Sequence, residues 1–380
     1  MDDKLNINRK VSNLGSRSSS IKLREEITKL MILFRDAGAS ELALSSLLDS
    51  NVLIDLYGED IRNRAYTTID PLGEKKILRP DFTVPIVQMH ILSENKYGKY
   101  SYSGPVWRSQ SYDSRKPSEY YQAGFEYFHE IEASRADAEV FDLFQRCTIG
   151  LELDIELGDM GILRAIVNCL DISDNKRRLL LRHLWRPDRF RQLLKQLSNG
   201  HSTTDTRTAL FRAIKSEKFN EYVQENGPII GRRSLKEIDL RSNELLKEES
   251  KKPISRAALM MIEKIQRLKC SLSSAPNRII EFLSLGNELE DVCDNLSNRI
   301  QVMTEIGIDV DKLSFATNLS QTSLEYYDGF IFSMSVKGFP DIPPVSQGGR
   351  YNELTSILTK GASVPAVGGI IRPEILSSLR

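Results

Sequence analysis

The stretch Leu78-Arg-Pro-Asp-Phe-Thr-Val-Pro-Ile86 places an acid and a hydroxyl two residues apart, and two later stretches carry further polar pairs. The later stretches are Ser103-Gly-Pro-Val-Trp-Arg-Ser-Gln110 and Tyr121-Gln-Ala-Gly-Phe-Glu126. Side chains two or four apart on an extended strand project from one face of a sheet, so the expected pairs are Asp81 with Thr83, Arg108 with Gln110 and Gln122 with Glu126. Two carboxylates, a guanidinium, a hydroxyl and a carboxamide suit a small zwitterion, whose ammonium would meet the acids and whose carboxylate would meet Arg108. The three stretches therefore predict an amino-acid pocket.

The order of these pieces resembles the catalytic domain of class II aminoacyl-tRNA synthetases, and among them histidyl-tRNA synthetase. Phe34-Arg-Asp-Ala-Gly-Ala-Ser-Glu41 resembles the family's first motif, and the stretch from Gly104 to Glu126 resembles its second. Leu324-Glu-Tyr-Tyr-Asp-Gly-Phe-Ile-Phe332 resembles the histidine-specific segment, while Gly348-Gly-Arg-Tyr-Asn352 and Pro365-Ala-Val-Gly-Gly369 resemble the end of the domain. The resemblance covers most of the chain except about 171–285. It implies seven histidine-contacting residues: Asp81, Thr83, Arg108, Gln122, Glu126, Tyr326 and Tyr327.

The chain departs from the synthetase motifs at six positions, namely Ser45, Gln110, Ser118, Thr322, Arg372 and Ile375. Gln110 replaces the acid that helps to hold ATP, and Thr322 replaces the arginine that neutralises the α-phosphate. Arg372 and Ile375 stand where the third motif has a glycine that accommodates the nucleotide and an arginine that clamps it. Losing one preorganised charge at a site of developing negative charge costs on the order of 100- to 1000-fold in rate. Two cationic phosphate ligands are absent here, so adenylate chemistry is not expected.

An intact amino-acid half beside a lost ATP half resembles the regulatory subunits of ATP phosphoribosyltransferase, a catalytically inactive family of histidyl-tRNA synthetase paralogues. The resemblance implies a short-form catalytic subunit as partner, histidine as effector, and a homodimer, joined around the first motif, within a hetero-oligomer. It implies neither catalytic residues nor a bound cofactor. The chain ends at Arg380, shortly after the third motif, so an anticodon-binding domain and a tRNA partner are not expected.

Composition limits the function classes. The 380 residues are 40% hydrophobic, enough for a sizeable core, and 52 Lys and Arg balance 52 Asp and Glu. A formal net charge of zero gives no support for nucleic-acid binding. The four cysteines, at 147, 169, 270 and 293, lack metal-ligand or CxxC spacing and are expected to be buried, reduced thiols. With neither a membrane-spanning apolar run nor a signal peptide, the sequence predicts a cytoplasmic protein.

The expected fold is α+β, a mostly antiparallel sheet of about six strands flanked by helices, as in class II synthetases, with a helical insertion. Residues 1–19 are polar and predict a mobile lead-in, and residues 20–170 and 286–380 form the two parts of the synthetase-like domain. Residues 171–285, dense in Arg, Lys, Glu and Leu, predict an insertion of amphipathic helices. Its charges indicate either solvated helix faces or a partner-docking surface.

Local patterns predict the elements around the pocket. Ile27, Leu30, Met31 and Phe34 recur at helical spacing, with Gly38 as a stop signal, and the pattern of residues 136–151 is also helical. Residues 63–130 are rich in strand formers, with a hairpin loop over 113–117, and 153–157 predicts another strand. A helix is expected from about 286 to 306, followed by strands that carry Tyr326, Tyr327 and residues 348–351.

Each candidate residue also has a purely structural explanation. Residues 79–83 could form a turn with a buried salt bridge, and Glu126 could be a structural acid paired with Arg108. Tyr326 and Tyr327 could be core residues, and on a strand only one of them would reach the pocket. Residues 348–349 could be turn glycines or could permit close backbone approach to a ligand, and Arg350 could serve the fold or the site.

Other chemistries find little material in the sequence. The four histidines are scattered without metal-ligand spacing, and neither GxSxG, CxxC nor a Walker-type loop is present. Three hypotheses remain: a histidine-sensing regulatory subunit, a diverged amino-acid-activating enzyme, and an amino-acid-binding protein with another partner. Turnover of ATP separates the first two, and co-purification with a small phosphoribosyltransferase separates the first from the third.

Overall fold

The computed structural model describes most of the chain, namely residues 17–50, 63–111, 114, 116–129, 131–199, 204–227, 234–250, 253–319, 326–359, 361 and 363–380. These residues divide into two compact units. The first unit comprises residues 1–162, 267–281 and 290–380, and the second comprises 163–266 and 282–289. The expected lead-in over 1–19 lies outside the described residues up to residue 16. Its last three residues belong to a helix, α2, which contradicts a mobile lead-in at that point.

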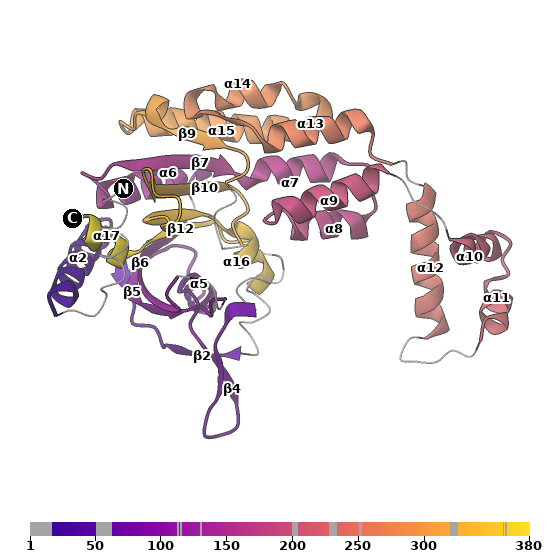
Figure 1. Ribbon diagram of the computed structural model, residues 1–380, viewed down its shortest axis with the longest axis horizontal. Helices are drawn as coiled ribbons and strands as arrows, with labels where there is room; N and C mark the ends of the chain where they lie inside the picture. Colours follow the sequence, from indigo (N-terminus) through magenta and orange to yellow (C-terminus); the bar gives the residue numbers. More distant parts are fainter. Residues whose placement is uncertain are drawn as a thin grey trace. The chain divides into compact units, whose positions relative to one another are not determined.

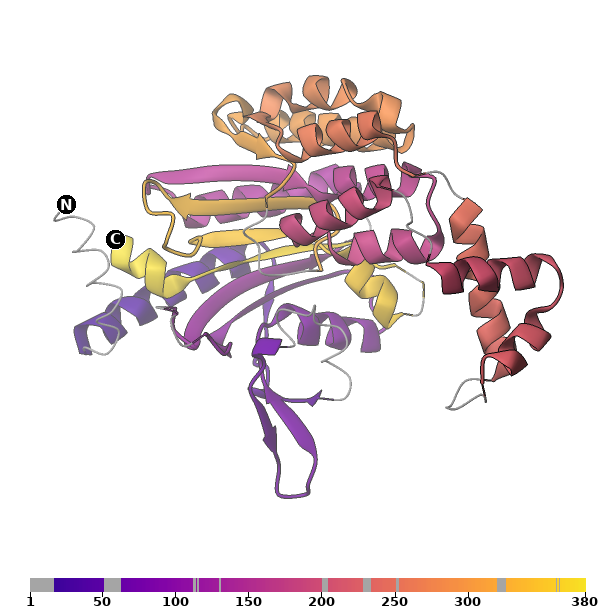
Figure 2. The same cartoon turned by 45° about the vertical axis from the view of Figure 1, so that its right-hand side comes forward.

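A nine-stranded sheet forms the first unit, in the order β1-β5-β6-β12-β11-β10-β7-β9-β8 (Figure 1). Its strands are β1 (Ser40–Glu41), β5 (Gly98–Trp107), β6 (Glu119–Phe128), β7 (Leu153–Asp159), β8 (Lys269–Ser271), β9 (Ser314–Ala316), β10 (Phe330–Val336), β11 (Ser346–Arg350) and β12 (Ala366–Ile371). From β5 to β7, all five neighbouring pairs are antiparallel, which confirms the expected antiparallel core of six strands. Figure 2 shows the purple β5 and β6 in one layer with the yellow strands of the C-terminal part, so distant segments share one sheet.

Two helices, α2 (Arg17–Asp36) and α6 (Ala133–Cys147), pack on one face of this sheet. The apolar stripe of α2 buries Leu30 and Phe34, and the Phe34 ring lies 5.9 Å from the rings of both Phe125 and Phe144. Phe144 of α6 continues the contact to Phe332 of β10, at 5.4 Å between centroids. The helical patterns around residues 27–34 and 136–151 therefore form as predicted, and Gly38 ends the first helix with a φ of 90°. This aromatic core occupies one face and leaves the other for a site.

Buried ion pairs join this helical layer to the sheet. Asp137 of α6 accepts from Arg350 of β11 at 2.7 Å and from Arg299 of α15 (Glu288–Glu305) at 2.9 Å. Arg299 also donates to Asp159 at the end of β7, at 2.9 Å. Two arginines and two aspartates thus balance in charge, as buried ions must to be tolerated. Arg350, for which the sequence left two roles open, serves the fold. The helix expected from 286 to 306 is confirmed by α15.

The opposite face of the sheet carries α5 (Thr83–Leu92), whose His90 ring stacks on Phe128 of β6 at 3.8 Å. Helix α16 (Asn352–Leu358) packs against α5, and the C-terminal α17 (Pro373–Leu379) packs against α2 (Figure 1). A separate three-stranded sheet, ordered β2-β4-β3, consists of β2 (Leu47–Asp49), β3 (Thr67–Ile69) and β4 (Lys75–Leu78). The remaining elements of this unit are short: η1 (Leu272–Ser274), α14 (Ala275–Ile280) and η3 (Val310–Lys312).

The second unit is helical wherever it is described. Its elements are most of α7 (Met160–Cys169), α8 (Asp174–Arg182), α9 (Pro187–Ser198), α10 (Asp205–Lys215), α11 (Phe219–Glu225), α12 (Leu235–Ser250), α13 (Arg256–Gln266) and η2 (Leu283–Leu285). Surface pairs such as Arg241 with Glu244 are exposed, which favours solvated faces for its charges. The insertion over 171–285 stays a prediction as a domain assignment, but its residues 267–281 lie in the first unit because β8 pairs with β9 there.

Two smaller expectations can be compared with the structure. All four cysteines are free; Cys147 and Cys293 are buried as expected, whereas Cys169 and Cys270 are only half-buried. A search of the described helices for one with the length and apolar character needed to cross a membrane finds none.

Candidate functional site

Glu126 lies on the face of the sheet opposite α2 and α6 and is fully buried. Its carboxylate accepts hydrogen bonds from three hydroxyls: Thr83 Oγ1 at 2.6 Å, Tyr102 Oη at 3.1 Å and Tyr351 Oη at 2.6 Å. Among the described residues it makes no ion pair, so the structural alternative of a pair with Arg108 is not realised. We call Thr83, Tyr102, Glu126 and Tyr351 the Glu126 cluster.

The Glu126 cluster lacks a cation, and this determines its electrostatics. Burial, with a smaller contribution from the charge of the neighbouring Asp81, raises the pKa of Glu126 to about 7, although the hydrogen bonds from Thr83, Tyr351 and Tyr102 lower it. Burial likewise raises the pKa of both tyrosines, and the Glu126 charge adds to the effect, so both phenols stay protonated and act as donors. A buried carboxylate with hydroxyl donors alone would gain much from a cationic guest.

Two glycines let these side chains lie flat on the sheet. Gly124 is directly opposite Tyr102, and a methyl group built on it would meet the Tyr102 ring at 2.3 Å. Gly368 of β12 is directly opposite Glu126, and a methyl group there would lie 1.8 Å from Glu126 Oε2. The side chains of the Glu126 cluster can therefore lie against the sheet only because Gly124 and Gly368 have no side chains.

Asp81 and Thr83 reach the site from a helix, which corrects the prediction of a strand. Asp81 precedes α5 and Thr83 is its first residue, while Asp81 Oδ1 accepts from the Val84 amide at 3.2 Å. Both side chains are buried, and the charge of Asp81 acts on Glu126. Arg79, just before them, donates to the Leu44, Ser45 and Pro105 carbonyls, so it fixes the neighbouring loops.

Tyr326 and Tyr327 lie before β10 and not on a strand, which corrects the strand on which the expectation that only one of them reaches the pocket was based. Their rings are 5.0 Å apart, and Tyr326 and Tyr327 lie 6.0 and 6.5 Å from the Tyr351 ring. Burial raises the pKa of both phenols, and the charges of Glu126 and Asp81 raise both further. Both tyrosines therefore face the Glu126 cluster. Most of the histidine-specific segment before them, including Thr322, lies outside the described residues.

Gln122 and Arg108 complete the predicted set. Gln122 shares its strand face with Glu126, and its buried Oε1 has no hydrogen-bond partner among the described residues. Arg108 follows the end of β5, is 2% exposed, and donates from Nε to the Pro80 carbonyl at 2.8 Å. It acts electrostatically on Tyr327, which places the guanidinium beside the same cluster. All seven predicted residues thus lie on one side of one sheet, although only Gln122 and Glu126 are on a strand.

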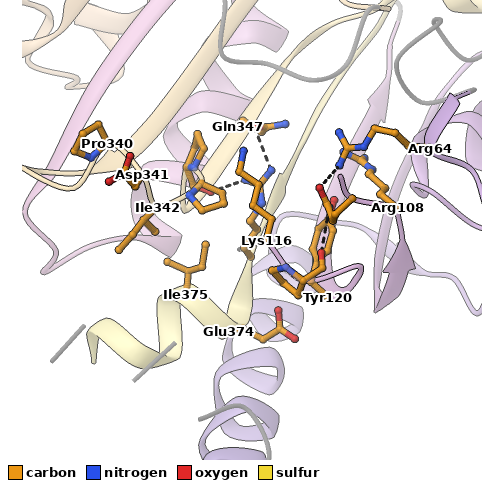
Figure 3. Close-up of a pocket in the computed structure, with 15 residues that line it drawn as sticks. Arg64, Arg108, Lys116, Tyr120, Pro340, Asp341, Ile342, Gln347, Glu374 and Ile375 are labelled. Atoms are coloured by element: carbon orange, nitrogen blue, oxygen red, sulfur yellow. Dashed lines mark hydrogen bonds between the residues drawn. The ribbon is translucent and has the colours of Figure 1, made fainter. Parts of the chain in front are cut away.

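A cavity of about 330 Å³ opens beside Arg108 (Figure 3). It is lined by fifteen residues, four of them basic (Arg64, Arg108, Lys116 and Arg372) and two acidic (Asp341 and Glu374). We call it the cationic cavity. Gln110 borders it and is held by protein groups, because Oε1 accepts from Arg64 at 3.0 Å and Nε2 donates to the Pro117 carbonyl at 3.2 Å.

Three of the six positions that depart from the synthetase motifs, Gln110, Arg372 and Ile375, line the cationic cavity. Arg372 is 8% exposed and donates to the Pro344 carbonyl and to Gln347 Oε1. Ile375 presents an apolar side chain, 7% exposed, to the same cavity. The carbonyl of Ser118 accepts from the Arg108 amide at 2.8 Å. Because the buried Arg372 side chain stands where the motif has a glycine, it occupies part of the cavity, which the sequence alone did not indicate.

Sequence reasoning missed four residues of this region: Tyr102, Tyr351, Gln347 and Arg64. Tyr102 could have been found, because its parity on β5 places it on the same face of the sheet as Gln122 and Glu126. Gly348 and Gly349 are strand residues, and methyl groups there would meet Phe332 and Tyr327 at 2.6 and 3.0 Å. These two glycines are therefore not turn residues, and they allow close packing against other protein atoms. No group of three or more metal-binding side chains occurs among the described residues.

A mostly antiparallel sheet with helices on both faces and a buried polar cluster on one of them is the arrangement expected of the class II aminoacyl-tRNA synthetase fold. A sequence model of the family "Histidyl-tRNA synthetase" matches residues 17–230 and 230–376. This protein therefore belongs to the histidyl-tRNA synthetase family.

Similar proteins carry two kinds of name. The chain is 27% identical over 351 residues to an ATP phosphoribosyltransferase regulatory subunit of Allorhizobium ampelinum, covering 88% of this chain and 92% of that protein. Its counterpart in Sinorhizobium fredii is 26% identical over 336 residues, 83% of this chain and 86% of the relative. Among solved structures, an ATP phosphoribosyltransferase regulatory subunit/histidyl-tRNA synthetase from Bacillus halodurans superposes with a TM-score of 0.66 at 17% identity, over 95% of this chain and 80% of that one. A histidine–tRNA ligase subunit from Alicyclobacillus acidocaldarius gives 0.60 at 20%, over 96% and 94%. The structural matches establish the fold.

Proposed function

We propose that this protein is a non-catalytic regulatory subunit of ATP phosphoribosyltransferase, the enzyme of the first step of histidine biosynthesis. It activates a short-form catalytic subunit and conveys feedback inhibition by histidine. Relatives that span nearly the whole chain bear the regulatory-subunit name, which supports the assignment. The proposal also includes a cytoplasmic location and a homodimer within the hetero-oligomer.

The observation that carries the proposal is the buried Glu126 carboxylate, which accepts from three hydroxyls and has no cationic partner among the residues that the structure describes. With Asp81 beside it, the pocket has two acids where an α-ammonium would bind. Binding of that ammonium would lower the pKa of Glu126 and make its ionised form favourable. Arg108, at the other end of the cluster, is the partner for the α-carboxylate.

A side chain with a ring N–H suits the remaining groups. The buried Oε1 of Gln122 lacks a donor among the described residues, and an imidazole N–H would supply one. Tyr326 and Tyr327 add aromatic walls beside the cluster. Histidine is therefore the proposed effector, contacted by Asp81, Thr83, Arg108, Gln122, Glu126, Tyr326 and Tyr327.

The cationic cavity argues against amino-acid activation by this chain. Where the synthetase motifs hold the nucleotide, Gln110 is held by Arg64 and Pro117, Arg372 occupies a glycine position and Ile375 is apolar. An amino-acid sensor that cannot activate its ligand acts through contacts that differ between the active and inactive states of a partner.

The test is reconstitution with the short phosphoribosyltransferase from the same cell. We expect a hetero-oligomer by light scattering, a higher transferase rate on mixing, and inhibition by histidine that requires this chain. Glu126→Ala should abolish the inhibition while leaving the complex intact, because it removes the ammonium partner. Glu139→Ala, which removes a half-exposed acid paired with Arg135 on α6, is the matched control and should behave as wild type.

The results separate the alternatives. If neither a complex nor a rate change forms, the regulatory assignment is wrong and a binding protein with another partner remains. If the complex forms and Glu126→Ala and Arg108→Ala both respond to histidine as wild type, the effector site lies elsewhere.

A further inference from the structure

Arg372 is a buried cation that the described residues leave without an acid. It follows β12 and is 8% exposed, and its acceptors among the described residues are the Pro344 carbonyl and Gln347 Oε1, the latter at 3.4 Å. A guanidinium carries five N–H donors, so two acceptors leave donor capacity. Burial lowers the pKa of Arg372 to about 10, and the nearby Arg108 charge lowers it further. Burying an arginine beside another arginine is costly unless an anion compensates it.

Gln347 supplies a second, independent observation. It is 1% exposed, and its Nε2 has no hydrogen-bond partner among the described residues. The donation from Arg372 to Oε1 fixes which end of the amide is nitrogen. A buried NH₂ group without an acceptor, lining the same cavity as Arg372, points to an acceptor supplied from outside the protein.

The balance of charge in the cationic cavity indicates the valence of that acceptor. Arg64, Arg108, Lys116 and Arg372 oppose Asp341 and Glu374, an excess of two positive charges. Burial raises the pKa of Glu374 to about 7, although the Tyr121 amide at 3.2 Å lowers it, so its negative charge is only partial at neutral pH. A phosphate monoester carries about −1.5 to −2 charges at pH 7 and three acceptor oxygens, and it would balance this excess.

The shape of the cavity adds room for an organic part. Its volume of about 330 Å³ exceeds that of one phosphate, and Tyr120, Ile342 and four prolines form apolar walls. Glu374 belongs to α17, and Figure 3 shows it below Lys116. Lys116 is exposed, so its ammonium can reach a ligand from the solvent while Arg372 and Gln347 donate from buried positions.

We propose that the cationic cavity binds a small phosphorylated metabolite, with its phosphate held by Arg372, Gln347 and Lys116. A sugar phosphate and inorganic phosphate share this chemistry. An adenine nucleotide is not the proposed ligand, because the Arg372 side chain stands at the position where the synthetase motif keeps a glycine to admit it. The cavity adjoins the amino-acid cluster because Arg108 borders both, but none of the three proposed phosphate-binding residues is among the proposed histidine contacts. The proposal stands whether or not the chain regulates a transferase.

Calorimetric titration of the full-length protein, without partner or histidine, tests this. The probes are inorganic phosphate, ribose 5-phosphate and AMP, each at constant ionic strength set with chloride. We expect ribose 5-phosphate and phosphate to bind, and Arg372→Gln to weaken both at least tenfold. Lys116→Gln, a change at an exposed position that does not threaten folding, should weaken both several-fold, while Arg135→Gln, an exposed arginine of α6, should match wild type.

Several outcomes would overturn the proposal. They are the absence of heat with both phosphate and ribose 5-phosphate, equal weakening by Arg135→Gln and Lys116→Gln, and AMP binding ten times tighter than ribose 5-phosphate. The last would mean a nucleotide site. A thermal melt gives a second measure: ribose 5-phosphate should raise the melting temperature of wild type and not that of Arg372→Gln.

Discussion

Two buried acids of the first unit show how a structural residue differs from a binding residue. Asp137 accepts from Arg299 and Arg350, so its charge is compensated by the protein itself. Glu126 accepts from three hydroxyls, and its charge is compensated by none of the described residues. The first arrangement holds α6 to the sheet, and in the proposed function the second leaves a place for a cation. Residue type and burial alone would not separate them.

The raised pKa of Glu126 predicts a pH dependence of stability. A folded-state pKa of about 7 against the ordinary 4.5 means that the folded protein keeps this proton longer than the unfolded chain. The contribution of Glu126 to the free energy of unfolding is therefore fully present below pH 4.5 and is lost as the pH rises through about 7. The change is roughly 3 kcal/mol, at 1.36 kcal/mol per pKa unit. Urea unfolding at pH 5, 6 and 7 should show a smaller loss in Glu126→Gln than in wild type.

Other groups titrate in the same pH range, so the test is the difference between the pH profiles of wild type and Glu126→Gln. Glu374 also has its pKa raised to about 7 by burial, so its contribution to the stability of the folded protein likewise falls as the pH rises. His90 and His129 have pKa values lowered by burial and act in the opposite direction. All of these remain in Glu126→Gln and cancel in the difference. Identical pH profiles for the two proteins would show that Glu126 is ionised throughout.

At the scale of elements, two glycines on β12 face opposite sides of the sheet and offer a matched pair of substitutions. Gly368→Ala would put a methyl group 1.8 Å from Glu126 Oε2 and displace the carboxylate, so histidine affinity should fall tenfold or more. Gly369→Ala would meet Phe144 at 3.0 Å on the helical side, so it should cost stability and leave affinity in the folded protein unchanged. Calorimetry with histidine and thermal melts would separate the effects. Equal histidine affinities for the two variants would show that the absence of a side chain at Gly368 is not needed for binding.

Arg350 joins β11 to α6, and its removal should act on the fold. Arg350→Met takes one partner from the buried Asp137 and leaves the Ala133 carbonyl without its donor, which typically costs about 3–5 kcal/mol. We expect a lower midpoint of urea unfolding together with unchanged histidine affinity below that midpoint. The exposed Arg146→Met, which breaks a surface pair with Asp142, should cost less than about 1 kcal/mol. A stable Arg350→Met protein that no longer binds histidine would instead place Arg350 in the site.

Strand alternation predicted the elements that carry Gln122 and Glu126 because one face of β6 is packed against helices and the other is polar. It failed at Thr83 because Pro85 fits the first turn of a helix, where its missing N–H costs nothing, so the segment begins α5. It failed at Tyr327 because Asp328-Gly329, a turn-forming pair, follows directly. An alternating pattern of only two or three residues is a weaker predictor of a strand than a proline in the first turn of a helix or an Asp-Gly turn is of its own structure.

At the scale of the molecule, the sequence predicted the six antiparallel strands but not the three short strands at the sheet's edges. β1, β8 and β9 have only two or three residues each and form through pairing with distant segments, such as β8 with β9. The cationic cavity was missed for the same reason. Its walls come from residues 64, 108, 110, 116, 117, 120, 340–344, 347, 372, 374 and 375, which lie far apart in the sequence and are brought together by the fold.

This convergence around one cavity predicts that the protein does not activate histidine. Of the groups with which the synthetase motifs bind ATP, Gln110 is held by Arg64 and Pro117, and Ile375 presents no charge. The two lost cationic ligands are those at Thr322 and Ile375, and each loss costs roughly 100- to 1000-fold, so together they reduce the rate by about 10⁴-fold or more.

Histidine-dependent ATP–pyrophosphate exchange should therefore equal a control without protein, while a histidyl-tRNA synthetase assayed in parallel shows exchange. Calorimetry on the same preparation should still detect histidine, because Asp81, Arg108 and Glu126 are in place. Exchange above the control that disappears in Glu126→Ala would mean that the amino-acid cluster serves catalysis after all. The cationic cavity would then have to admit ATP around Arg372, which would contradict both the regulatory function and the compact phosphate site.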